Sequence, residues 1–252
     1  MKYAKWIVVI LIIAILAGCG GRSKKDLRPV TVVQVEKVPA ALADEEEPEP
    51  VESLDLPVIK WDDREVFRAG LVPEEQGVLD ELQGASVYHV DVDIPEDLET
   101  VSGHLEVHYT NREDVELEVV YFRLYPNVSG GKVAISEVTV EGEAVEAGEQ
   151  YGGSALRVPM SSPLTVGDTV LIGMDFVATL PREMGGNYGL FGFFDNVMVL
   201  DEFLPTIAVY DDEGWNVEVP PPAGDWTHYD ASFFVVTVTA PKDLTLAASG
   251  YE

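Results

Sequence analysis

Strict alternation of apolar and polar residues is the feature that most constrains the fold of this chain. The sequence reads YHVDVDI at residues 88–94 and VSGHLEVHYT at residues 101–110, with an apolar residue at almost every second position. Successive side chains of a β-strand point to opposite faces of a sheet, so a period of two gives each segment one apolar and one polar face. Both segments are therefore predicted to be half-buried strands.

Further segments have the same signature of short strands separated by turns. Residues 115–124 also alternate, but the apolar face changes between Val119 and Val120, and a one-residue slip of this kind predicts a β-bulge. More strands are expected at residues 133–140, 155–160, 169–178, 233–240 and 244–248. Many short strands with little helix predict an all-β fold in which antiparallel sheets pack face to face as a β-sandwich.

Only the segment before the first strand has a helical pattern. Pro73 suits the first position of a helix, and Val78, Leu79 and Leu82 lie on one helical face. Residues 61–84 are therefore interpreted as a short helical or irregular lead-in, and residues 85–252 as the β domain.

The N-terminus has the pattern of a secretory signal. Lys2 and Lys5 precede eleven uninterrupted apolar residues at 6–16, too few for a helix that crosses about 30 Å of hydrocarbon. The run ends in Leu-Ala-Gly followed by Cys19, which resembles the bacterial lipobox. This resemblance implies a signal peptide at residues 1–18, a lipid on Cys19, and a membrane-anchored lipoprotein in the bacterial cell envelope that faces outside the cytoplasm. The alternative is an ordinary signal peptide with an incidental cysteine.

Acidity dominates the rest of the N-terminal region and the chain as a whole. The formal net charge is −29, which argues against nucleic acid or an anionic membrane surface as an electrostatic partner. Residues 19–60 contain the stretch DEEEPEP, and repelling charges together with proline predict an extended, solvated tether. This tether is interpreted as a spacer that lifts the domain off the membrane; an interaction tail for a basic partner is the alternative.

Residues 180–230 depart from the alternation and are rich in glycine, proline and aromatic residues. A segment of this length outside regular structure is usually functional or covered by another surface. Motifs for hydrolytic chemistry are absent, since the chain has neither His-Glu-x-x-His nor Gly-x-Ser-x-Gly. His104, Glu106 and His108 share one strand face, which suits either a divalent metal or a solvated polar surface.

A family resemblance rests on motifs that occur in a fixed order. They are GHLEVHYTN at 103–111, VYFRLYPN at 120–127, FLP at 203–205, VYD at 209–211, GWN at 214–216, and residues 233–250. In this order they resemble the N-terminal β domain of the aminopeptidase N-type (gluzincin) zinc metallopeptidases. The resemblance implies a saddle-like β domain that walls the substrate cleft beside a thermolysin-like catalytic domain.

The resemblance also implies that catalytic residues and zinc ligands of the family are not to be expected in this chain. The zinc helix of the family lies downstream of such a domain, so no catalytic residue and no metal ligand carries over, and no cofactor is expected in this chain. Zinc is expected only in a catalytic domain supplied in cis or in trans, and the chain is interpreted as truncated or split and inactive alone. The family places one acidic or amide side chain near the substrate's amino terminus, which points to Asp195 or Asn196; a turn-capping aspartate is the alternative.

A stand-alone lipoprotein module is the second functional hypothesis. Its aromatic residues would stack on sugar rings or bind a partner protein. The candidates are Tyr210, Trp215, Trp226 and Tyr229.

Overall fold

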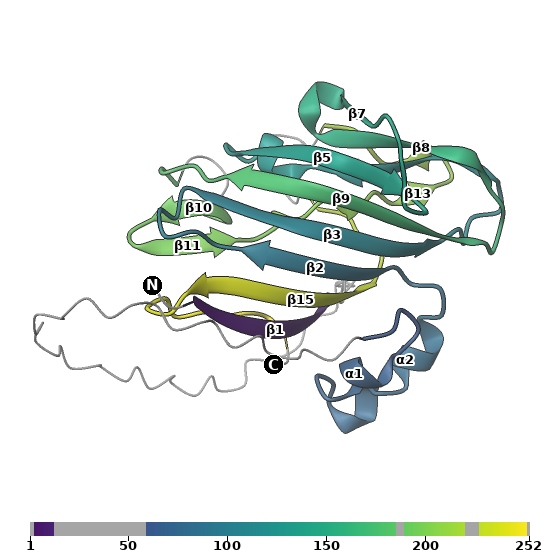
Figure 1. Ribbon diagram of the computed structural model, residues 1–252. Helices are drawn as coiled ribbons and strands as arrows, with labels where there is room; N and C mark the ends of the chain where they lie inside the picture. Colours follow the sequence, from purple (N-terminus) through teal and green to yellow (C-terminus); the bar gives the residue numbers. More distant parts are fainter. Residues whose placement is uncertain (1–2, 13–58, 185–188, 220–226, 251–252) are drawn as a thin grey trace, which may run out of the picture.

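Two packed β-sheets form the body of the protein. The computed structural model describes residues 3–12, 59–184, 189–219 and 227–250. Figure 1 shows the larger sheet as a twisted surface running from β1 to β5, with α1 and α2 beside one end of β2 and β15. The all-β, antiparallel multi-sheet fold predicted from the alternation is confirmed.

The larger sheet has seven strands in the order β1-β15-β2-β3-β9-β5-β6. Its neighbours are antiparallel except for β15 and β2, which run parallel. The strands are β1 Tyr3–Ile12, β2 Val87–Asp93, β3 Thr100–Thr110, β5 Lys132–Val140, β6 Glu143–Ala144, β9 Thr169–Thr179 and β15 Ser232–Pro241.

The smaller sheet has four strands in the order β12-β4-β8-β7, and two further hairpins form two-stranded sheets of their own. Its strands are β4 Leu117–Arg123, β7 Gly148–Gln150, β8 Ala155–Leu164 and β12 Thr206–Ile207. The hairpins pair β10 Phe191–Phe194 with β11 Val197–Leu200, and β13 Tyr210–Asp211 with β14 Gly214–Trp215. Two 3-10 turns, η2 Tyr125–Asn127 and η3 Tyr151–Gly153, lie between strands.

The main core is built from the apolar faces that the alternation predicts. Along β2 and β3 the buried residues fall at every second position, and they join buried residues of β4, β8 and β9 in one cluster. Gly103 interrupts the apolar face of β3 for a steric reason: a Cβ there would lie 2.0 Å from the Asp91 carbonyl oxygen and 2.7 Å from the Phe176 ring. Glycine is therefore the residue that lets β3 approach both neighbours at this position.

The predicted irregularity in residues 115–124 exists, but its position differs. The register between β4 and β8 shifts between Leu117 and Val119, where Leu117 pairs with Leu164 and Val119 pairs with Pro159. The extra residues thus belong to β8, the partner strand. A slip in the alternation of one strand shows that its apolar face changes. Only its pairing with the neighbouring strand shows which of the two strands carries the extra residues.

The lead-in contains three short helical turns, so the single predicted helix is wrong in its extent. They are α1 Glu65–Arg68, η1 Pro73–Glu75 and α2 Val78–Glu81. Pro73 does occupy a first helical turn, but the turn ends after Glu75 and Gly77 precedes the next one. Glycine favours helix interruption because of its backbone freedom.

These turns cover the outer face of the larger sheet with a second small core. Phe67 and Leu79 pack with Val87 of β2 and Phe233 of β15, and the Phe67 and Phe233 rings lie 4.6 Å apart. β15 is consequently covered on both faces where it carries the unbroken apolar run Phe-Phe-Val-Val. A strand buried on both faces no longer needs alternation.

Two other predictions are changed by the structure. Residues 244–248 form no strand, and the predicted irregular region at 180–230 contains five short strands in its described parts. At the N-terminus, β1 pairs antiparallel with β15 over Tyr3–Ile12, within residues 1–18 that are predicted to be a signal peptide. In the described part of the chain no helix has the length and apolar character needed to cross a membrane.

Candidate functional site

The tip of the β10–β11 hairpin presents Asp195 and Asn196, the two residues singled out by the family resemblance. Both have left-handed backbones, with φ of 52° and 60°, and both are exposed. Two consecutive positive φ values make the two-residue turn whose twist suits a hairpin, and Asp and Asn tolerate that conformation better than other non-glycine residues. The backbone conformation explains why Asp and Asn suit this turn, and both a turn-capping role and a role toward substrate stay predictions.

Contacts at the base hold this hairpin on the core. Phe191 is 1% exposed, and its ring lies against the backbone of Gly131, where an added Cβ would come within 2.4 Å of it. The Phe193 amide donates a hydrogen bond to the Pro181 carbonyl at 2.9 Å, and the Arg182 guanidinium lies 4.8 Å from the centre of the Phe193 ring. The exposed turn is therefore displayed by an anchored element.

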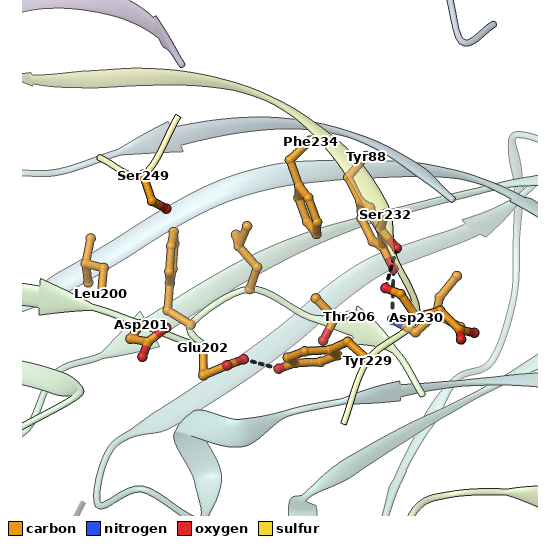
Figure 2. Close-up of a pocket in the computed structure, with 13 residues that line it drawn as sticks. Tyr88, Leu200, Asp201, Glu202, Thr206, Tyr229, Asp230, Ser232, Phe234 and Ser249 are labelled. Atoms are coloured by element: carbon orange, nitrogen blue, oxygen red, sulfur yellow. Dashed lines mark hydrogen bonds between the residues drawn. The ribbon is translucent and has the colours of Figure 1, made fainter. Parts of the chain in front are cut away.

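A pocket lies directly after this hairpin along the chain, between residues 200–207 and the strands β2 and β15. Its volume is about 140 Å³. Figure 2 shows Tyr88 and Phe234 on one side, with Glu202, Tyr229 and Thr206 across from them. The Tyr88 and Phe234 rings stack 4.4 Å apart, and the Tyr88 hydroxyl accepts a hydrogen bond from the Ile207 amide at 2.9 Å.

Glu202 is the most perturbed acidic group of the pocket. Burial raises its pKa from 4.5 to about 7, while a hydrogen bond from the Tyr229 hydroxyl favours the ionised form and opposes part of this rise. Burial also raises the pKa of Tyr229, so that its hydroxyl keeps its proton and acts as the donor. The sequence analysis missed Glu202 because nothing in the local sequence distinguishes it among 45 acidic residues.

Three of the four histidines, His89, His104 and His108, lie on β2 and β3 of the larger sheet. His104 Nδ1 lies 2.6 Å from Asp175 Oδ1 on the neighbouring strand, whereas His108 lies beneath Trp61, with the two ring centres 5.5 Å apart. Trp61 also stacks on His89 at 3.8 Å. Among the described residues no three His, Cys, Asp or Glu side chains form a group able to hold a metal ion. The zinc of the resembled family therefore finds no fitting ligand set in this part of the chain.

The aromatic residues proposed for stacking on sugars pack against one another. Trp215 lies 5.2 Å from Tyr210 and 6.1 Å from Tyr121, measured between ring centres. Tyr229 meets Tyr125 edge-on at 5.6 Å and contributes its hydroxyl to the pocket. Trp226 lies outside the described residues, as does Cys19. The described aromatic rings thus contact one another and are half-buried, and a role in binding sugars or a partner protein stays a prediction.

Comparisons with known proteins give a fold likeness. No family model and no curated protein matches the chain. An M1 zinc metallopeptidase variant from Deinococcus radiodurans with a bound Tyr-Ser-Ala substrate is similar at 18% identity and a TM-score of 0.43, covering 62% of this chain and 32% of that chain. The enzyme without the substitution gives 19% identity and a TM-score of 0.41, covering 62% and 31%.

A third solved structure extends the same likeness. A two-domain M1 zinc metallopeptidase variant bound to L-tryptophan is similar at 17% identity and a TM-score of 0.42, covering 63% of this chain and 34% of that chain. The chain thus spans about a third of the length of these metallopeptidases. This likeness concerns the arrangement of strands, and no activity is carried over from it.

Proposed function

We propose that this chain supplies the β domain of a zinc aminopeptidase-like protein and forms one wall of its substrate cleft, beside a thermolysin-like catalytic domain. The observation that carries the proposal is the anchored hairpin turn at Asp195 and Asn196. It presents an exposed acid and amide a little before Phe203-Leu204-Pro205, the part of the sequence in which the family resemblance implies such a group. The ordered motifs at residues 103–127 and 203–250 support the same family.

The role proposed for the chain is to bind and orient, without catalytic residues of its own. A carboxylate or amide oxygen at the cleft wall accepts a hydrogen bond from the protonated amino terminus of a peptide, and this contact fixes which bond enters the reaction centre. Zinc, held by the catalytic domain, supplies the activated water of the family's hydrolysis.

The coding sequence that follows codon 252 tests this proposal. The expected finding is an in-frame His-Glu-x-x-His segment, or such a segment in a protein that binds this chain. The 252-residue chain alone is expected not to hydrolyse aminoacyl-nitroanilides. Absence of a zinc helix both in the continuing frame and in any bound protein would contradict the proposal, and so would metal-dependent turnover by the chain alone.

In the assembled enzyme, Asp195→Ala is expected to raise KM for an aminoacyl-nitroanilide about tenfold or more, because a hydrogen bond to a charged group contributes ~1.5–3 kcal/mol. Asp212→Ala, which removes an exposed acidic side chain next to the β13–β14 hairpin, is the matched control. Equal KM values for the two variants would remove Asp195 from the substrate site and leave Asn196 as the candidate.

Attachment to the cell envelope through Cys19 forms a separate part of the proposal. Cys19→Ser is expected to move the protein from the membrane fraction to the soluble fraction, or to leave it uncleaved, because serine lacks the thiol that receives the lipid. Several acyl chains give stable anchoring where one does not. Fractionation and mass spectrometry of the mature protein measure the effect, and a wild-type protein without added acyl mass would overturn it.

A further inference from the structure

The pocket bounded by residues 200–207, β2 and β15 combines a cavity with an unpartnered polar atom. Thr206 is 8% exposed, and its Oγ1 accepts no hydrogen bond among the described residues; its hydroxyl lies beside that of Tyr229. A buried hydroxyl without a partner is costly and calls for an explanation. Since Thr206 lines the cavity, a bound ligand is one way in which this hydroxyl is satisfied.

The backbone at Glu202 is the second unusual feature. Its φ is 57°, a left-handed value that costs free energy in a residue other than glycine. In this conformation the mostly buried carboxyl of Glu202 lies in the pocket, opposite the stacked rings of Tyr88 and Phe234. Strained residues of this kind cluster at ligand sites, where the surrounding structure maintains them.

The charged residues around the cavity determine whether it favours a cationic or an anionic ligand. Asp201, Glu202 and Asp230 line it, and no Lys, Arg or His is among its described lining residues. Of the nearby basic groups, Arg112 lies outside the lining but 3.7 Å from Asp230, whose charge it offsets, and Arg123 stacks over Tyr125 at 5.0 Å; the Asp201 and Glu202 carboxyls have no basic residue beside them in the described lining. A pocket of carboxyl groups and aromatic faces favours a cation through ion pairing and cation–π attraction.

We propose that this pocket binds a small organic ammonium ion, with the Glu202 carboxylate and Thr206 Oγ1 accepting its N–H groups and its apolar stem lying against Tyr88 and Phe234. The size agrees, because a protein cavity of about 150 Å³ holds a benzene-sized molecule. The site is distinct from the turn at Asp195 and Asn196. It does not depend on the aminopeptidase proposal.

Ionisation of Glu202 makes this binding pH-dependent. Its pKa of about 7 results from burial and from the nearby Asp201 carboxyl, opposed by hydrogen bonds from Tyr229 and Thr227. Tyr125, with Arg123 over its ring, lies beside Tyr229, and Asp230 lines the same pocket. A carboxylate attracts an ammonium ion, and a protonated carboxyl does not. The affinity is therefore expected to rise about tenfold between pH 6 and pH 8, following the ionised fraction of a group with this pKa.

Calorimetric titration of the purified chain with benzylamine tests the proposal, with benzyl alcohol as the neutral probe of matched shape. We expect benzylamine to bind at pH 8 at least tenfold more tightly than benzyl alcohol. Glu202→Gln is expected to weaken benzylamine binding tenfold or more and to remove its pH dependence. Thr206→Val, which keeps the side-chain shape, is expected to weaken binding two- to tenfold, the loss of one hydrogen bond.

Glu116→Gln is the matched control. It removes one exposed carboxylate at the residue before β4 and is expected to leave benzylamine binding unchanged. Cooperative thermal unfolding of each variant shows that it is folded. The proposal is overturned if benzylamine fails to bind the wild-type chain at pH 8. Equal binding of benzyl alcohol, or unchanged binding by a folded Glu202→Gln variant, overturns it as well.

Discussion

Phe176→Ala is expected to lower the free energy of unfolding by about 3–5 kcal/mol, the range measured when a large buried aromatic side chain is truncated. Phe176 is 1% exposed in β9, the strand that pairs with both β3 and β5. Its ring occupies the space above Gly103 and meets Phe203 edge-on, with the ring centres 6.2 Å apart. Removal of the ring therefore leaves a cavity between the sheet and the segment that lines the pocket.

Urea unfolding followed by far-UV circular dichroism measures this loss. Val177→Ala is the matched control, because Val177 is the next residue of the same strand and is 44% exposed. Its truncation is expected to cost less than about 1 kcal/mol, as for most surface substitutions. Similar losses of unfolding free energy for the two variants would contradict the packing of Phe176 between β9 and Phe203.

Glu202→Gln is expected to stabilise the protein at neutral and alkaline pH. The pKa of Glu202 is about 7 in the folded protein and 4.5 in its ordinary state, so folding favours the protonated carboxyl. Below pH 4.5 the carboxyl is protonated in both states and contributes nothing to the pH dependence. Between pH 4.5 and 7 the unfolded chain ionises first, and the stability of the wild-type protein falls as the pH rises.

The size of this effect follows from the separation of the two pKa values, at ~1.4 kcal/mol per pH unit. Glutamine stays neutral and keeps an oxygen that accepts the Tyr229 hydrogen bond, so the variant is expected to gain up to ~3 kcal/mol over wild type at pH 8 and almost nothing at pH 4. Unfolding free energies measured across this range test the prediction, with Glu116→Gln as the control. A pH-independent difference between Glu202→Gln and wild type would contradict the raised pKa.

Prediction from sequence succeeded for strands with one buried face. β2, β3, β5 and β9 begin and end close to the expected positions, because alternation records directly which side chains face the core. It failed at residues 244–248, where β-prone residues find no pairing partner in the structure. A strand exists only if another strand satisfies its backbone hydrogen bonds, and local composition carries no information on that partner.

The candidate site residues also differ in whether the sequence indicated them. Asp195 and Asn196 were singled out through the order of the motifs, and a two-residue turn of Asp and Asn is itself a local signal for a hairpin; their role toward substrate stays a prediction. Glu202 and Thr206 were not found, because their properties depend on residues distant in sequence. The raised pKa of Glu202 comes from burial by the surrounding chain, and Thr206 is enclosed by Tyr229 and β15, which follow it after a long separation.

The sequence by itself therefore determined where the half-buried strands β2, β3, β5 and β9 lie, which face of each is apolar, and the strongly acidic character of the chain. Each is a local property, set by side-chain alternation or by residue type. The tertiary structure alone decided that β15 inserts beside β2 in parallel, that β8 carries the bulge, and that a pocket with a mostly buried carboxyl opens beside these strands. These features arise because packing joins segments from about forty to more than a hundred residues apart, and burial then changes the chemistry of the groups enclosed between them.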